Sequence, residues 1–363
     1  MTPANAKVKF YKYALGFLLA YTLPLLPIFF AWIGQKTGWA NWSVAIPLLL
    51  AYVLVGIIQY FYPKTLKNPD YTLSSPSWLL YYRALPLLSP FLQLYMLYYG
   101  GEYWNSDALT IWGKLIYLLT IGMFSALFAI NFSHELLHRP HAFDRAVSCV
   151  LLSMVCFGSF KIVHNKIHHR YVGTPLDFAT AQRGLSIYRF WWRTYPQNFL
   201  TALNLEKARL AKSGQCFWHS ELFYGYALSL VWLSLAVMLW GLGGAVFFLG
   251  QSFIAIGQLE WINYLQHYGL ERRRYANGRY EPVSAEHSWS QSLMLHDRAL
   301  LNLFRHADHH VHAAKPYFLL QHLLEAPKYP YQHLAMMGLS LIPPLFRKVV
   351  HPCLDRLQTN KLL

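Results

Sequence analysis

The chain of 363 residues is poor in cysteine and in charged residues, and each shortage excludes a class of protein. Its four cysteines form no C-x-x-C pair, which argues against a disulfide framework and against a thiolate metal site. Only 13% of the residues are charged, and the 31 Lys and Arg residues outnumber the 16 Asp and Glu residues. Because the basic residues are dispersed along the chain rather than gathered in one patch, we expect no nucleic-acid partner.

Apolar sequence is abundant instead, since 55% of the residues are hydrophobic and 17% are aromatic. A transmembrane helix needs about 20 mostly apolar residues. The sequence therefore predicts an all-α polytopic membrane protein, with about six transmembrane helices and a histidine-rich helical cap, in a single domain over residues 1–363. The predicted spans are 11–33, 43–61, 78–99, 110–132, 222–240 and 244–264, and the predicted cap comprises 133–220 and 265–363.

The placement of charge gives the spans an orientation. Eight Lys and Arg residues precede Ser133, 11 lie in residues 134–220, and 12 follow Tyr268, whereas the loop at 100–108 carries two acids and no base. Cytoplasmic loops hold the excess of positive charge. We therefore expect an integral protein of a bacterial inner membrane, with both termini and the cap on the cytoplasmic side.

Nine histidines fall into four tight groups: HELLH, HNKIHH, the single histidine of NYLQHYG, and RHADHH. Imidazole is a common metal ligand, and residues three or four positions apart share one face of a helix. We expect each group to point its imidazoles one way, with His169 turned aside toward a neighbouring metal or a supporting position. The nine residues are His134, His138, His164, His168, His169, His267, His306, His309 and His310.

The order of the spans brings all four groups to one side of the membrane. The first group follows the fourth span directly, and the fifth and sixth spans leave and return before the third group. The apolar run at 147–160 is too short to cross and is expected to lie along the interface. A mononuclear zinc site needs three protein ligands, so nine imidazoles indicate two metal ions. Ligand counting leaves iron, copper, nickel and zinc open.

Two other classes of protein compete with a redox enzyme. HELLH matches H-E-x-x-H, in which the glutamate is the general base of a zinc protease, here through His134, Glu135 and His138. That reading leaves most of the grouped histidines without a role. A metal carrier or sensor is the other alternative, but carriers usually place their polar residues within the spans, and these groups lie beyond the span ends.

Together the segments HELLHRP, HNKIHHRYVGTPLDFATAQRG, NYLQHYGLER, HSW and RHADHHVHAAKPY resemble the integral-membrane alkane hydroxylase family, within the membrane fatty-acid hydroxylase and desaturase superfamily. The resemblance covers about residues 131–346. It implies that the nine histidines bind two irons, which activate O2 and insert one oxygen atom into a terminal or methyl C–H bond of a hydrophobic substrate. It also implies a rubredoxin- or ferredoxin-type electron donor with its reductase.

Residues around the groups are expected to support the site, because a ligating histidine usually donates its second N–H to a carboxylate or carbonyl. Most of the candidates are acids near the groups, and His312 is the histidine best placed to reach substrate. The supporting candidates are Glu135, Asp177, Glu260, Gln266, His287, Asp308 and His312. The remaining histidines, among them His296 and His333, are expected at the surface or the membrane interface.

Departures from the family pattern leave the substrate open. Alkane hydroxylases commonly carry Glu just before the leading histidines of the second and third groups, where this chain has Val163 and Gln266. The xylene monooxygenase branch, which oxidises a methyl group on an aromatic ring, is more similar at NYLQHYGL and TPLD. A third branch decarboxylates medium-chain fatty acids to terminal alkenes, and a centre with fewer acids would accept a carboxylate more easily. Desaturation on the same scaffold is a further alternative.

Overall fold

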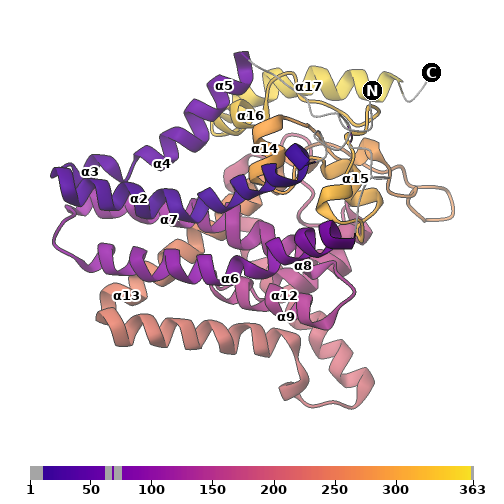
Figure 1. Cartoon of the computed structure of the whole chain (residues 1–363). Helices are drawn as coiled ribbons and strands as arrows, with labels where there is room; N and C mark the ends of the chain where they lie inside the picture. Colours follow the sequence, from indigo (N-terminus) through magenta and orange to yellow (C-terminus); the bar gives the residue numbers. More distant parts are fainter. Residues whose placement is uncertain (1–10, 62–67, 69–75, 361–363) are drawn as a thin grey trace.

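The computed structural model of the chain describes residues 11–61, 68 and 76–360 (Figure 1). Regular structure in these residues is helical, apart from one isolated antiparallel bridge between Arg274 and Tyr280. The expected all-α class is therefore confirmed. The first ten and last three residues, which belong to the expected termini, lie outside the described residues.

Several helices are long and apolar enough to cross a membrane, which confirms a polytopic membrane protein. The first contains η1 (Phe17–Tyr21) and α2 (Thr22–Thr37), and the next runs through α3 (Ala40–Ser43), α4 (Ile46–Leu48), η2 (Leu49–Leu54) and α5 (Val55–Phe61). Another joins α7 (Ile111–Ser125), η4 (Ala126–Ile130) and α8 (Asn131–Leu137). The four candidate spans are Tyr11–Thr37, Ala40–Phe61, Ile111–Leu137 and Glu221–His267.

The last candidate, α13 (Glu221–His267), contains the fifth and sixth predicted spans in one helical segment of 47 residues. Its backbone turns at Gly241, where φ is 60° and ψ is −148°, a conformation that glycine adopts without a Cβ clash. A Cβ at Gly244 would lie 2.1 Å from the carbonyl oxygen of Ala236, so only glycine allows the two arms to meet this closely. Figure 1 shows the second arm turning back from the far end of the first, so that α13 leaves the cap and returns to it.

Helix α6 (Pro76–Asn105) contains the third predicted span, 78–99, but is not among the four candidates. Its 30 residues are long enough to cross a bilayer, which takes about 20. Six tyrosines, Arg83 and two internal prolines make it less apolar than its neighbours. It packs along α2, α7 and α13. The number of six spans accordingly stays a prediction.

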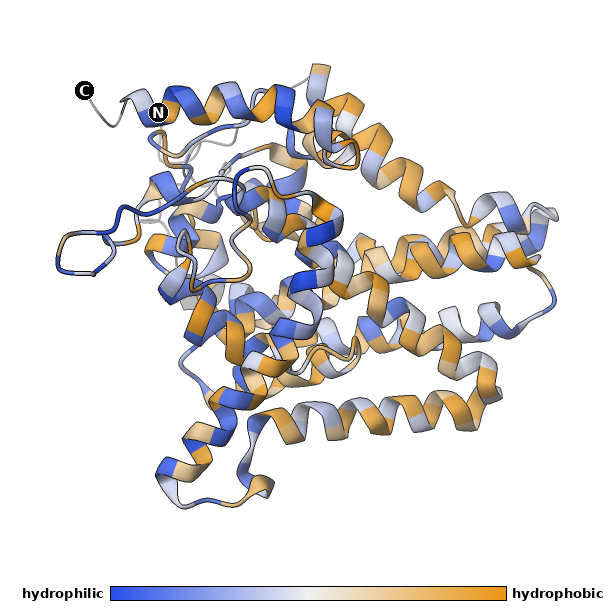
Figure 2. Ribbon diagram, turned by 180° about the vertical axis from the view of Figure 1, so that it is seen from behind, coloured by the Kyte–Doolittle hydropathy of each residue, from blue (hydrophilic) through white to orange (hydrophobic). Residues whose placement is uncertain are grey.

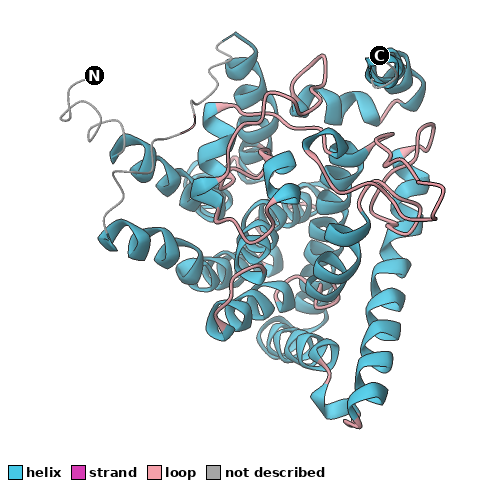
Figure 3. Ribbon diagram, turned by 90° about the vertical axis from the view of Figure 1, so that its right-hand side faces the viewer, coloured by secondary structure: helices cyan, strands magenta, loops and turns pink. Residues whose placement is uncertain are grey.

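The cap consists of loops, the 27-residue helix α12 (Ile187–Ser213) and shorter helices, and it lies at one end of the membrane helices. Figure 2 shows that the long helices are mostly hydrophobic and that hydrophilic residues gather in the cap. Figure 3 looks onto the cap, where most of the loops lie. The cap helices include α9 (Ala142–Ser153), α10 (Phe160–Val163), α11 (His169–Tyr171), α12 (Ile187–Ser213), α14 (Met294–Ala299), α15 (His306–Val311), α16 (His333–Ser340) and α17 (Pro343–Asn360). With 12 residues, or about 18 Å, α9 is too short to span a bilayer.

Candidate metal centre

The nine grouped histidines converge from four separate parts of the chain into two adjacent clusters. Within each cluster, one ligand nitrogen from every ring lies within 4.8 Å of the others. We call the set of five the outer group and the set of four the inner group. The outer group is His134, His138, His164, His169 and His309, and the inner group is His168, His267, His306 and His310.

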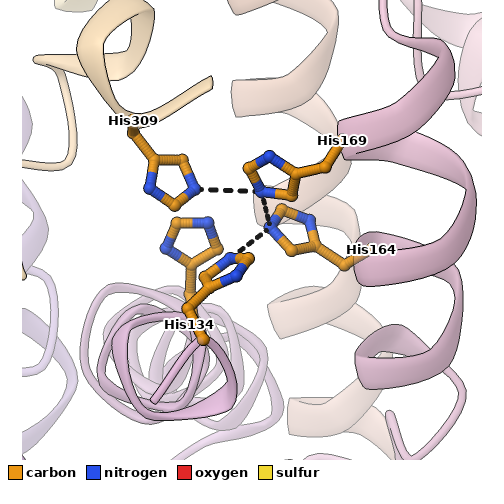
Figure 4. A group of neighbouring side chains, drawn as sticks. His134, His164, His169 and His309 are labelled. Carbon is orange, nitrogen blue, oxygen red and sulfur yellow. Dashed lines mark hydrogen bonds between the residues drawn. The ribbon is translucent and has the colours of Figure 1, made fainter. Parts of the chain in front are cut away.

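The histidines of the outer group come from three places: α8 and its C-terminal end, the segment directly after α10, and α15. Figure 4 shows His134, His164, His169 and His309 turned toward one another from these elements. The Nε2 atom of His164 lies 2.9 Å from that of His169 and 3.2 Å from that of His138. The Nε2 atom of His309 lies 3.1 Å from that of His169. Five imidazole nitrogens therefore surround one small volume.

The inner group lies deeper, where the end of α13 meets α15. The Nε2 atom of His306 lies 3.0 Å from that of His267 and 2.9 Å from that of His310. The His168 ring completes the group, with its centroid 4.8 Å from the His267 and His310 centroids. All four side chains are buried.

The HNKIHH segment divides between the two groups, which corrects the expectation that His164 and His168 point the same way. Residues His164–His168 form a π-helix, η5, with hydrogen bonds from i to i+5 instead of i+4. The wider turn brings His169, five positions after His164, into the same outer group. His168 then reaches the inner group, so that His168, and not His169, is the residue turned toward the neighbouring site.

The RHADHH segment divides as well, again unlike the expectation of one shared direction. His306 and His310 are one α-helical turn apart on α15 and both join the inner group. His309 lies on the adjoining side of this helix and enters the outer group. One short helix thus supplies ligand atoms to both groups, which holds the two clusters next to each other.

The electrostatics of the groups favour neutral imidazoles. Burial lowers the pKa of His164, His309 and His310 well below the usual range for histidine, and the neighbouring imidazoles lower it further. A neutral ring has a lone pair on one nitrogen and can bind a cation, whereas a protonated ring cannot.

The spacing of the nitrogens fits metal ligands. Imidazole nitrogens bind a metal at about 2.0–2.1 Å, so two such ligands at right angles are about 3 Å apart. The separations between Nε2 atoms within the groups are 2.9–3.2 Å. The buried Nε2 atom of His168 has no hydrogen-bond partner, and it faces the inner group. Each group therefore has the donor set and the spacing to hold one metal ion.

Asp177 supports the inner group as expected from its position in TPLD. Its Oδ2 atom lies 2.9 Å from Nδ1 of His168 and also accepts a hydrogen bond of 2.7 Å from the Thr180 hydroxyl. Its Oδ1 atom accepts one of 3.0 Å from the Ala179 N–H. Because the carboxylate holds Nδ1–H of His168, the lone pair on Nε2 is directed at the inner group. His267 is held in a similar way, with its Nδ1 atom 3.3 Å from the carbonyl oxygen of His287.

The polar contacts of three other expected supporting residues are with residues outside the two histidine groups. Asp308 faces away from both groups and binds His312 Nδ1 (3.0 Å), the Lys315 ammonium (2.7 Å) and the Gln321 N–H (2.6 Å). The His312 side chain is 59% exposed, which places it at the surface instead of beside the metal site. Glu135 is paired with Arg139 and accepts the Tyr317 N–H at 3.2 Å. Asp308 and Glu135 therefore connect segments of the cap near the site.

Of the other expected residues, His287 contacts a grouped histidine through its backbone, whereas Glu260 and Gln266 are buried residues of α13. The side chain of His287 binds Glu281 and Ser284, so its support of His267 comes from its backbone carbonyl. Buried Glu260 accepts a hydrogen bond of 3.4 Å from Asn263, and in the described part of the chain none joins it to a grouped histidine. Gln266 is buried beside His267, and its Nε2 atom has no partner.

Sequence reasoning missed several buried polar residues. His296 and His333, expected at the surface or the membrane interface, are buried, and both rings pack against Phe304. A buried ion pair, Arg305 with Asp297 at 3.1 Å, anchors the residue before His306. Asn131 was missed too, although a lone amide in an apolar run three positions before His134 is a signal that can be read from sequence.

Two cavities lie next to each other, and the smaller one borders the grouped histidines. A small one of about 20 Å³ is bordered by His134 and His164 of the outer group and His306 of the inner group. An apolar one of about 220 Å³ lies among α2, η2, α13 and α14. Leu127 and Ile262 border both. The apolar cavity therefore adjoins the small cavity at the metal centre.

Comparisons with known proteins agree with this geometry. The fatty acid desaturase family matches residues 109–340. Alkane 1-monooxygenase 2 of Alcanivorax borkumensis is 33% identical, with 99% of this chain and 95% of the relative covered. Alkane 1-monooxygenase 1 of Pseudomonas aeruginosa is 37% identical over 95% of this chain and 91% of its own. The hydroxylase component of xylene/toluene monooxygenase from Pseudomonas putida is 30% identical over 63% of this chain and 61% of its own. The chain therefore belongs to the fatty acid desaturase family and, within it, to the alkane 1-monooxygenases.

Proposed function

We propose that this chain is a membrane di-iron monooxygenase that hydroxylates a terminal or methyl C–H bond of a hydrophobic substrate. The observation that carries the proposal is a small cavity that residues of both histidine groups border and that shares two lining residues with an apolar cavity. The names of the relatives, alkane 1-monooxygenase and xylene/toluene monooxygenase, support the reaction class. In this proposal the outer group holds one iron and the inner group holds the other.

The substrate is an apolar chain or an alkyl aromatic that enters from the bilayer. Support comes from the apolar cavity, whose lining includes Leu23, Leu26 and Val55 on the membrane helices. Its common border with the small cavity at Leu127 and Ile262 would place the end of the molecule beside His134, His164 and His306. Burial of the apolar surface supplies the binding free energy.

The protein residues position the reactants, and the two irons, when bound, supply the O2 activation that no side chain can supply. Overall, one oxygen atom enters the C–H bond and the other is reduced to water, which consumes two electrons and two protons. Asp177 and the His287 carbonyl keep His168 and His267 in the orientation that binds metal. The apolar walls of the larger cavity exclude water from the chain of the substrate.

The electrons are proposed to come from a rubredoxin- or ferredoxin-type protein and its reductase, at the cytoplasmic face of a bacterial inner membrane. A cleft of about 900 Å³ on the cap, lined by four arginines and four acidic residues, is the docking site that we propose for this donor. Arg193, Arg273 and Arg274 contribute to its lining, and so does Asp177, which contacts His168. A single side chain, that of Asp177, thus connects the cleft to His168 of the inner group along this path. The excess of basic residues in the cap supports the cytoplasmic orientation.

Product identification tests the function. Purified protein with reduced rubredoxin, its reductase and O2 should convert n-octane to 1-octanol or an alkylbenzene to the benzylic alcohol. One atom from labelled O2 should appear in the product. A terminal alkene and CO2 from a free fatty acid, without alcohol from either hydrocarbon, would replace hydroxylation by oxidative decarboxylation. Peptide cleavage independent of O2, with zinc as the bound metal, would replace it by proteolysis.

A further inference from the structure

The small cavity at the metal centre contains two buried amides that the proposed hydroxylation does not use. Asn131 and Gln266 both border it, between the outer and inner groups. Their side chains are only 5% and 1% exposed, respectively. The Asn131 Nδ2 atom and the Gln266 Nε2 atom have no hydrogen-bond partner. The rest of the lining is apolar, apart from Asn263 and the three histidines.

Their positions come from the two helices that build the site. Asn131 follows the π-helix η4 (Ala126–Ile130), one turn before His134. Gln266 directly precedes His267 at the end of α13, where its carbonyl oxygen accepts the Trp289 N–H at 2.8 Å. Each amide is therefore fixed by the same backbone that presents a grouped histidine.

Unpartnered N–H groups in such a place are costly. Leaving a buried donor unsatisfied destabilises a protein, and the chain end of an alkane offers no acceptor to either amide. An oxygen atom has lone pairs for two donors. The cavity volume of about 20 Å³ is enough for one water-sized group. A hydroxyl group has that size, whereas a carboxylate has two oxygen atoms.

We propose that Asn131 and Gln266 form a binding site for a hydroxyl oxygen at the end of an apolar chain, so that the primary alcohol is a ligand of the same chamber as the hydrocarbon. The proposal rests on the proposed function for the identity of the ligand's hydrocarbon chain. The recognition of the hydroxyl group rests on the two amides alone. A site built to hydrogen-bond a hydroxyl discriminates against the analogue that lacks it. The alcohol that the enzyme produces would then compete with the hydrocarbon substrate for this cavity.

Ligand binding without turnover tests this directly. The dissociation constants of 1-octanol, n-octane and octanoate are measured on the purified protein from thermal shifts, without O2 or electron donor. Gln266→Met should weaken 1-octanol binding about tenfold, which corresponds to about 1.4 kcal/mol, and change n-octane binding less than twofold. Gln266→Leu removes both the N–H donor and the amide oxygen, and should also weaken 1-octanol selectively.

Gln258→Met is the matched control. Gln258 is buried on the same helix and borders the apolar cavity but not the small one. Its replacement should change 1-octanol and n-octane binding by the same factor. If the folded Gln266 variants bind 1-octanol like the wild type, or lose both ligands equally, the proposal is wrong. A larger loss of octanoate than of 1-octanol would assign the amides to a carboxylate instead. Selective alcohol binding by a wild-type protein that oxidises no hydrocarbon would overturn only the proposed function.

Discussion

Replacement of His164 by alanine should abolish turnover and remove metal from the outer group. The ring lies at the centre of this group, within 3.2 Å of two other imidazole nitrogens, and it borders the small cavity. Its loss removes a ligand and opens a cavity in a packed site. We expect the rate to fall at least 100-fold and the metal content to fall by about one ion per chain, as measured by elemental analysis and product formation.

The control for this variant is His141→Ala. His141 is exposed at the start of α9 and contributes to neither histidine group. Its replacement should leave both metal content and rate within twofold of the wild type. A His164→Ala protein that keeps full metal content and wild-type turnover would show that the outer group is not a metal site.

The second large effect is expected from Asp177→Asn. The carboxylate of Asp177 accepts hydrogen bonds on both oxygens, from His168 and Thr180 on one and from the Ala179 N–H on the other. An asparagine has one acceptor oxygen, so its NH2 group must face one of these donors. Loss of such a partner typically lowers metal affinity or activity 10- to 100-fold. Competition with a chelator should show this loss for about one of the two ions.

Asp144→Asn is the matched control. Asp144 is equally buried, but it pairs with Arg83 at 2.9 Å, away from the histidine groups. This change should lower the melting temperature without altering the chelator titration. Equal metal affinity in the Asp177 and Asp144 variants would mean that Asp177 has a structural role only.

The helical membrane architecture could be read from the sequence because long apolar runs have few alternatives in a bilayer. The turn between the last two predicted spans could be anticipated at Gly241–Gly243, and the structure places it at Gly241. The number of spans could not be settled in the same way. Helix α6 has the length of a span but carries six tyrosines and an arginine, so hydropathy alone does not identify it.

The convergence of the nine histidines could also be predicted, because topology brings the four segments to one side. Their division between two groups could not, since it depends on local helix geometry. A sequence pattern assumes 3.6 residues per turn, and the π-helix at His164–His168 replaces this turn by a wider one. As a result, His168 and His169 exchange the roles that the regular spacing gives them.

Supporting residues were the least predictable part of the site. Closeness in sequence to a histidine suggested Asp308 and Glu135, but their carboxylates point to Lys315 and Arg139. Asp177, nine positions from His168, is in contact because the loop between them folds back. Which way a carboxylate points is decided by tertiary packing, and no local pattern contains that information.

The central claim is that each histidine group holds one redox-active metal ion. The iron content of the purified wild-type chain, determined per mole of protein after expression in iron-replete medium, tests it most directly. The proposed function predicts about two iron atoms per chain, with catalytic activity proportional to iron content. A fully active protein with a single metal ion, or with zinc and no iron, would contradict it.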